Sequence, residues 1–188
     1  MKKIIFATGN EDKMKEIRRI LADPSLEILS LKDAGIHADI DENGKSFEEN
    51  AMIKAEAISK MTGEIVLADD SGLEIDYLNK EPGIYSARYM GEDTSYHIKN
   101  ANLIQRLEGV PDEKTYRTFC MCYCGSFPDG RRKTVRAAWK AASATRKKGR
   151  MALAMTRSFI FRNMVALPQS FPWKKRTGSA IVEKLFAL

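Results

Sequence analysis

Hydrophobic residues in the first part of the chain follow the spacings of strands and helices in alternation. Residues 3–7 form a short apolar run that predicts a buried strand, and residues 8–10 follow as a turn. Apolar side chains then recur at helical spacing over residues 11–21, and residues 26–31 predict a second strand. This succession of strand, glycine-containing turn, helix and strand opens an α/β unit with a right-handed crossover.

A second helix has sequence signals at both ends. Ser46 and Glu49 have the spacing of a capping box, and Gly63 is a natural stop at the C-terminus. One face of this helix carries the apolar residues Phe47, Ala51, Ala55 and Ile58. Residues 65–68 then predict a short buried strand that ends in Asp69-Asp70-Ser71-Gly72.

The pattern continues as far as residue 136. A third helix is predicted over residues 97–107, with Ile98, Ala101, Ile104 and Leu107 in register. Residues 117–124 predict a strand, and a turn at residues 127–130 leads into the returning strand of a hairpin. Because Cys120, Cys122 and Cys124 alternate along the first of these strands, their thiols share one face. Buried thiols are favoured over a metal site, which usually needs C-x-x-C pairs.

Length and composition narrow the class of protein. A chain of 188 residues is long enough for one domain, or one two-lobed domain, with a real core. The apolar stretch at residues 4–7 is too short for a signal peptide or a membrane span. We therefore expect a cytoplasmic protein.

Charge divides the chain sharply. Residues 1–136 contain 20 Lys and Arg against 24 Asp and Glu, whereas residues 137–188 contain 11 Lys and Arg and one acid, Glu183. The net charge of +6 therefore comes entirely from the last 52 residues. A basic tail of this kind often binds nucleic acid, and aromatic residues among its charges make base stacking conceivable.

Two segments carry candidate chemistry. Residues 8–13 lie between a strand and a helix N-terminus, where backbone N–H groups and the helix dipole favour an anion, and Lys13 adds a positive charge. An ordinary turn is favoured from the pattern alone, because the Walker glycines are absent. Asp69 and Asp70 follow a buried strand and point to opposite sides of it, which fits either a Mg²⁺ site or a pair of turn acids. The acidic run at residues 39–42 offers another carboxylate, although a solvated loop is the better interpretation of it.

Four segments together resemble the inosine triphosphate pyrophosphatase-like family. They are TGNEDK (8–13), SFEENAMIKA (46–55), LADDSGLEID (67–76) and PGIYSARYMG (82–91), in order and with the family's spacing. The resemblance implies Mg²⁺-dependent hydrolysis of non-canonical purine nucleoside triphosphates (dITP, ITP, XTP) to the monophosphate and pyrophosphate. It also implies an α/β fold with an elongated mixed sheet, flanking helices, two lobes around a nucleotide cleft, and a homodimer.

The resemblance also implies roles for individual residues. Triphosphate binding is carried over to Thr8, Gly9, Asn10, Glu11, Asp12 and Lys13, and substrate contact to Ser71. Glu42 and Asp70 are the implied Mg²⁺ ligands, and Asp70 is the proton acceptor for the attacking water. Lys54, one helical turn from Asn50, is the implied catalytic lysine near the phosphates. Metal ions then neutralise phosphate charge while a carboxylate orients the nucleophile.

The family pattern stops near residue 136, because the family's GFGYDPIF and Ser-His-Arg motifs are absent from the tail. The gene can also be read in a shifted frame, in which each codon takes the last base of one residue's codon and the first two bases of the next. Codons read in this way permit both motifs at the expected spacing. Five such codons are fully determined, since Met and Trp have single codons, and all five fit the family pattern. They fall at Trp139-Lys140, Met151-Ala152, Met155-Thr156, Met164-Val165 and Trp173-Lys174.

We therefore interpret the tail as the product of a frame shift near codon 136, in the gene or in its sequencing. Residues 1–136 are then an incomplete pyrophosphatase domain, and residues 137–188 are an out-of-frame tail that we expect to be poorly ordered or misfolded. We expect little activity from the chain as written, because the segments that close the purine pocket are missing.

Two other functions remain as alternatives. One is a nucleic-acid-binding protein that uses the basic tail, with steeply salt-dependent binding. This alternative ranks below the frame shift, because the frame shift explains the tail's charge and its aromatic residues together. We expect neither a nucleic acid nor a membrane as a partner. The other is a related nucleotide-binding protein without catalysis.

The frame-shift hypothesis predicts the outcome of sequencing the gene across codons 130–140. We expect a single insertion or deletion near codon 136, relative to a frame that encodes the two missing motifs. An intact frame, together with the written tail found in the protein by mass spectrometry, would show a divergent C-terminal region instead.

Overall fold

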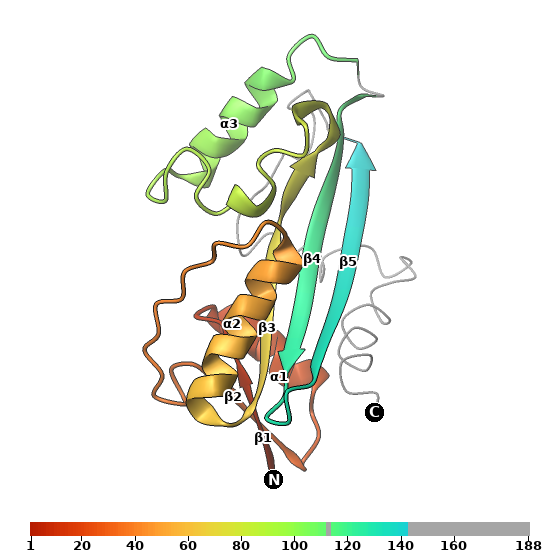
Figure 1. Cartoon of the computed structure of the whole chain (residues 1–188). Coiled ribbons are helices and arrows are strands. Elements are labelled where there is room, and N and C mark those ends of the chain that lie inside the picture. Colours follow the sequence, from red (N-terminus) through yellow and green to blue (C-terminus); the bar gives the residue numbers. More distant parts are fainter. Residues whose placement is uncertain (112–113, 143–188) are drawn as a thin grey trace. The chain divides into compact units, whose positions relative to one another are not determined.

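The computed structural model describes residues 1–111 and 114–142, and its strands form a five-stranded sheet in the order β2-β1-β3-β4-β5. Strand β1 pairs in parallel with β2 and with β3, whereas Figure 1 shows β4 running against its neighbours. The sheet is therefore mixed, as expected. The elements are β1 Lys2–Phe6, α1 Glu11–Ile20, β2 Leu26–Ser30, α2 Phe47–Thr62, β3 Ile65–Ile75, α3 Tyr96–Arg106, β4 Tyr116–Ser126 and β5 Arg132–Ala142, with single 3₁₀ turns at Asp76–Leu78 and Gly83–Tyr85.

The chain divides into two compact units. Among the described residues, the first comprises Met1–Asp70 and Met121–Ala137, and the second comprises Ser71–Cys120 and the end of β5 from residue 138. The predicted boundary between residues 1–136 and 137–188 falls inside β5, which runs on to Ala142. The rest of the predicted tail lies outside the described residues, so the expectation that it is poorly ordered or misfolded stays a prediction.

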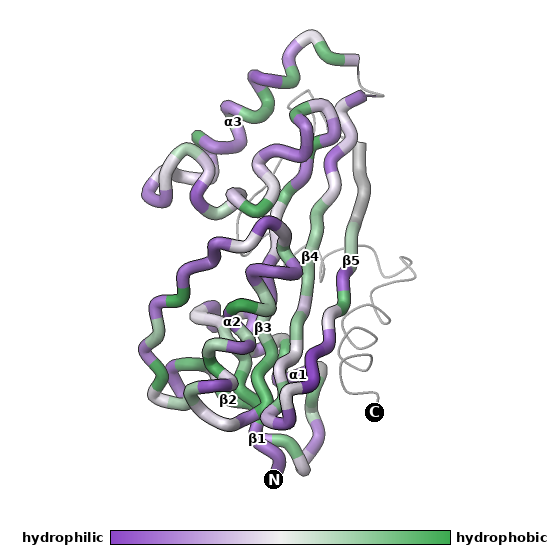
Figure 2. Tube along the Cα trace, in the orientation of Figure 1, coloured by the Kyte–Doolittle hydropathy of each residue, from purple (hydrophilic) through white to green (hydrophobic). Residues whose placement is uncertain are grey.

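Helix α2 covers one face of the first unit's strands with the apolar residues that the sequence assigns to it. Ala51, Ala55 and Ile58 are fully buried in a cluster with residues from β1, β3 and β4. Figure 1 shows α1 on the opposite face of these strands, and Figure 2 shows their hydrophobic character. Residues 4–6 of β1 and 66–68 of β3 are therefore buried on both sides, which explains their continuous apolar runs.

The two ends of α2 follow the sequence signals, with one difference. Ser46 Oγ accepts a hydrogen bond from Glu49 N at 3.1 Å, and Gly63 adopts a left-handed conformation with φ of 68°. The carboxylate of Glu49, however, accepts from Lys45 N at 2.6 Å rather than from Ser46 N. The backbone N–H that donates to the Glu49 side chain thus belongs to the residue before the N-cap. This hydrogen bond attaches the loop before α2 to the helix.

Strand β3 is longer than the sequence analysis predicts. It does not end at Ala68 but continues to Ile75, so Asp69 and Asp70 lie within the strand and not at its carboxyl end. The extension is possible because Asp69 is paired where it is buried, and because the positions of Gly72 and Leu73 that follow are buried again.

Helix α3 buries the predicted face only in part: Leu107 is buried and Ile104 packs against the same cluster, as predicted. Ile98 is 51% exposed and Ala101 is also exposed, whereas Lys99 and Leu103 are buried. Burial of Lys99 is made possible by a hydrogen bond from its ammonium to the Ala87 carbonyl at 2.7 Å. Apolar spacing alone therefore identified part of the buried face and gave no sign that Lys99 is buried.

The three cysteines of β4 are buried and form no disulfide, in line with the predicted buried thiols. Burial raises the pKa of Cys122 and of Cys124, and the nearby Glu48 carboxylate raises both further. The thiol of Cys124 also lies 3.4 Å from the Glu48 carbonyl and 3.3 Å from the Thr134 hydroxyl. These groups are packed as small apolar side chains rather than as reactive thiols.

We predict that the folded protein resists thiol reagents. With 5,5′-dithiobis(2-nitrobenzoic acid) at pH 8, we expect no rapid reaction in buffer and three reactive thiols in guanidinium chloride. The reason is that only the thiolate reacts, and raised pKa values and burial both suppress it. Rapid release of one equivalent of chromophore from the folded protein would contradict this packing of β4.

Candidate functional site

The segment from Thr8 to Lys13 joins β1 to α1 and is held in shape by its own side chains. Asn10 N donates to Thr8 Oγ1 at 3.2 Å, and Lys13 N donates to Asn10 Oδ1 at 3.2 Å. Asn10 therefore caps α1, which explains why a polar residue with a short side chain precedes this helix. A Cβ added to Gly9 would meet no heavy atom within 4 Å, so the backbone there is open on that side.

Lys13 points from α1 to β3. Its ammonium forms an ion pair with the Asp69 carboxylate, and the Asp69 side chain is only 2% exposed. A buried carboxylate is stable only with such a partner. Asp69 was not among the predicted site residues, yet it connects the phosphate-binding candidate segment to the strand that carries Asp70.

Asp70 faces the other side of β3 and interacts with α2. The side-chain amide of Asn50 donates to Asp70 Oδ2 at 3.1 Å. One helical turn further along α2, Lys54 Nζ lies 3.3 Å from Glu42 Oε1. Residues four apart on a helix have Cβ atoms about 6 Å apart. The two predicted metal ligands, Glu42 and Asp70, are therefore held by neighbouring side chains of one helix.

Gly44 permits the loop that carries Glu42 to approach α2. The Gly44 N–H donates to Asn50 Oδ1 at 2.9 Å. A Cβ at this position would lie 2.7 Å from that oxygen and 2.7 Å from Glu49 Cβ. Only glycine fits this approach, so the loop is attached to α2 both through Asn50 and through the ion pair of Glu42.

The carboxylate set fits a hard cation that is shared with a phosphate. Among residues 1–111 and 114–142, no group of three or more His, Cys, Asp or Glu side chains forms a metal-binding cluster. Mg²⁺ does not require one, because it is usually bound by one or two carboxylates with substrate phosphates and water. Oxygen ligands from Glu42 and Asp70, with Lys54 beside them, suit that arrangement.

Most of the predicted site residues therefore belong to one compact unit. The segment 8–13, Glu42, Lys54 and Asp70 all lie in the first unit, whereas Ser71 begins the second and is half-buried in β3. The sequence analysis offered Asp69 beside Asp70 as a possible Mg²⁺ or turn acid, and Asn50 with Lys54 on one helix face, but it did not predict their partners, and it missed Gly44. The signals for Asn50 were its helical spacing to Lys54 and its position beside the apolar stripe, which fit a site wall or simple exposure equally.

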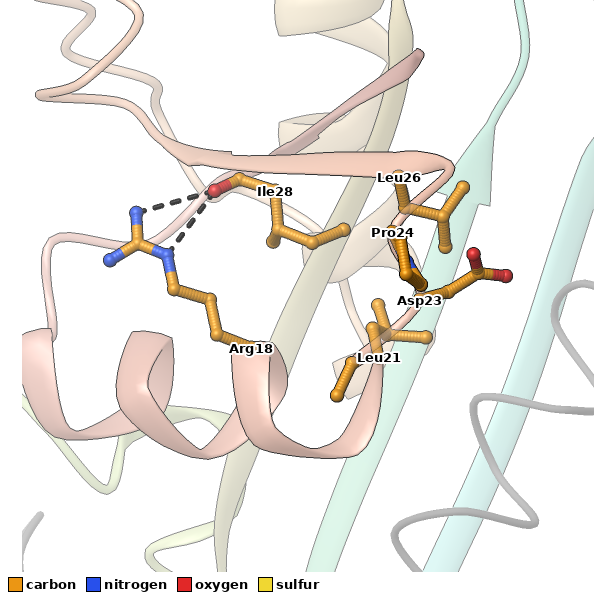
Figure 3. A pocket seen from close by; sticks show the side chains of 7 residues that line it. Arg18, Leu21, Asp23, Pro24, Leu26 and Ile28 are labelled. Carbon is orange, nitrogen blue, oxygen red and sulfur yellow. Dashed lines mark hydrogen bonds between the residues drawn. The ribbon is translucent and has the colours of Figure 1, made fainter.

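A separate open hollow, of about 390 Å³, lies where α1 ends and β2 begins (Figure 3). Arg18 lines it, and its guanidinium donates to the Ile28 carbonyl at 3.2 and 3.3 Å. It also donates to the Asp33 carboxylate at 2.6 Å. None of the predicted phosphate or metal residues lines this hollow, so it is not the candidate site.

The fold and this group of lysines and carboxylates define an α/β protein with a site suited to phosphate chemistry. The sequence model of the Ham1 family matches residues 4–163. The chain therefore belongs to the Ham1 family.

Known relatives agree with this assignment. A dITP/XTP pyrophosphatase of Bacillus licheniformis is 46% identical over 135 residues, which are 72% of this chain and 69% of that protein. The structure of the Ham1 protein of Staphylococcus aureus has a TM-score of 0.73 at 34% identity, over 79% of this chain and 75% of that one. A nucleoside-triphosphatase / dITP/XTP pyrophosphatase of Mycobacterium abscessus has a TM-score of 0.71 at 35% identity, over 81% and 80%.

The alignments are partial for several curated relatives. For three further dITP/XTP pyrophosphatases, of 47–51% identity, the chain spans only 57–61% of their length. The activity of the whole protein is therefore a proposal.

The Lys13–Asp69 pair predicts a large loss of stability when one partner is removed. Asp69→Asn should lower the free energy of unfolding by about 3 kcal/mol, because it leaves the Lys13 charge without its buried counterion. Urea unfolding measures this loss. Glu56→Gln is the matched control, since Glu56 pairs with the exposed Lys60 and Arg132, and its loss should stay below about 1 kcal/mol. Equal losses of unfolding free energy in the two variants would show that the buried Lys13–Asp69 pair stabilises the fold no more than an exposed pair does.

Proposed function

We propose that this chain hydrolyses non-canonical purine nucleoside triphosphates, such as dITP, ITP and XTP, to the monophosphate and pyrophosphate, and so cleans the nucleotide pool. Membership of the Ham1 family and the dITP/XTP pyrophosphatases among its relatives support the reaction. One observation from the structure supports it most directly. Asn50 and Lys54, one turn apart on α2, hold the carboxylates of Asp70 and Glu42.

The proposed roles follow from what each side chain can do. The segment Thr8–Lys13 binds the triphosphate through its backbone and the Lys13 ammonium. Glu42 and Asp70 are the proposed Mg²⁺ ligands, and a bound Mg²⁺ supplies charge neutralisation for the phosphates. Lys54 contacts the phosphates as a second cation, and Ser71 contacts the substrate.

Asp70 is the proposed proton acceptor. Its carboxylate takes the proton of the water that attacks the phosphorus atom, which raises the nucleophilicity of that water. The hydrogen bond from Asn50 fixes the orientation of the carboxylate, so that the accepting oxygen does not rotate away. Lys13 and Lys54 then balance the negative charge that develops on the phosphate oxygens.

We further propose a homodimer that works in the cytoplasm, as the family resemblance suggests. In the described part of the chain, no helix has both the length and the apolar character needed to cross a membrane. No observation on the described residues favours nucleic-acid binding by the tail. Binding without catalysis remains the second candidate, because the lysines and the segment 8–13 are sufficient for a phosphate ligand.

A pyrophosphate-release assay with dITP and Mg²⁺ tests the activity. We expect Asp70→Asn to reduce kcat at least 100-fold, because it removes the proton acceptor, while dITP binding measured by calorimetry stays within about threefold. Asn43→Ala is the control, since Asn43 is exposed in the same region and should leave turnover unchanged. Hydrolysis that survives Asp70→Asn would remove Asp70 from the reaction, and binding without turnover in the unchanged chain would favour the second candidate.

The same assay can test separately how the tail affects turnover. A protein whose gene is restored to the other frame from codon 137 should turn over dITP faster than the chain as written, because it regains the purine-pocket motifs. Equal turnover by both proteins would show that the tail as written is not the limiting feature.

A further inference from the structure

We infer that Asn50 is the positioning residue of this site, and that it fixes the Glu42 loop and the Asp70 carboxylate relative to each other. The inference rests on the proposed metal role of the two carboxylates and goes beyond it, because Asn50 acts through its neighbours and needs no contact of its own with phosphate or metal. It depends on the Asn50 side-chain amide accepting one hydrogen bond through its oxygen while it donates another through its nitrogen.

The orientation of the amide is determined by its two partners. Gly44 N–H can only donate, so it must face Oδ1, and an ionised Asp70 carboxylate can only accept, so it must face Nδ2. The two distances are 2.9 and 3.1 Å. Reversing the amide would oppose two donors on one side and two acceptors on the other. Asn50 therefore connects the loop and the strand in a single defined geometry.

Burial makes this connection stiff. Asn50 is 1% exposed, and a buried amide without partners is costly, so its two hydrogen bonds are retained. It lies next to Ala51 on the face of α2 that packs on β3, so its backbone is fixed as well. The Glu42–Lys54 pair, at 3.3 Å, joins two longer and partly exposed side chains and is much more adaptable.

Gly44 supports the same inference independently. The close approach of its Cα to Asn50 excludes any side chain, because a Cβ added to Gly44 would lie only 2.7 Å from Asn50 Oδ1. A loop that merely passed by would not need this approach. Glu42 is two residues before Gly44, so the position of Gly44 determines where the Glu42 backbone lies.

The test uses the full chain and two readouts. Asn50→Leu removes donor and acceptor at similar size, and Gly44→Ala displaces the loop while Asn50 stays intact. Hydrogen exchange followed by mass spectrometry should accelerate in the peptide covering residues 39–46 in both variants. The Kd for Mn²⁺, measured by electron paramagnetic resonance, should rise about tenfold or more, as for other residues that orient metal ligands. Asn43→Ala is the control, and both readouts should match those of the unchanged chain.

A double-mutant comparison separates positioning from general stability. Asn50→Leu should weaken Mn²⁺ binding clearly less in an Asp70→Asn background than in the unchanged chain, because only its effect through the Glu42 loop then remains. Additive losses, or unchanged exchange in residues 39–46, would overturn the inference. If Asn50→Leu fails to fold, Gly44→Ala decides through the same two readouts. If the unchanged chain binds no Mn²⁺, the metal role proposed above fails, and the exchange data alone decide whether Asn50 fixes the loop.

Discussion

The two-residue period of β3 is the constraint on which the site depends. Because successive side chains of a strand point to opposite faces, Asp69 meets α1 through Lys13, and Asp70 meets α2 through Asn50. A one-residue slip of this strand would exchange the two carboxylates and bury Asp70 where Asp69 is now paired. Val66 and Ala68 pack under α2 on the same face as Asp70, so the core and the chemistry share one register.

The fold was largely predictable because its signals are local. Helix α2 has its N-cap Ser46 and its left-handed Gly63 where the sequence places them, and β1 and β4 end within two residues of their predicted ends. The errors arose where tertiary contacts decide. Strand β3 runs through Asp69 because Lys13, 56 residues away, pairs with it. Helix α3 buries Lys99 because the distant Ala87 carbonyl accepts its hydrogen bond, and no periodicity contains that information.

The candidate site was predictable in part, and mainly through resemblance. Site residues such as Lys13 and Asp70 were predicted from sequence motifs, but the residues that they contact were not. Asn50 looked like a polar residue beside an apolar stripe, and Gly44 like an ordinary loop glycine. The importance of both depends on a close approach between a loop and a helix, measured in ångströms, which a linear sequence does not encode. The roles of these residues in turnover remain predictions.

The ion pairs of Lys13 and Lys54 have a consequence for how a polyanion is recognised. Each ammonium already has a carboxylate neighbour within the protein, so a triphosphate bound as proposed would add a second anionic partner to the same cation. Because those carboxylates already offset part of each ammonium's charge, salt has less net attraction to screen than at an unpaired lysine. Selectivity then comes from the geometry in which the lysines are offered, and the strength of binding should respond only weakly to ionic strength.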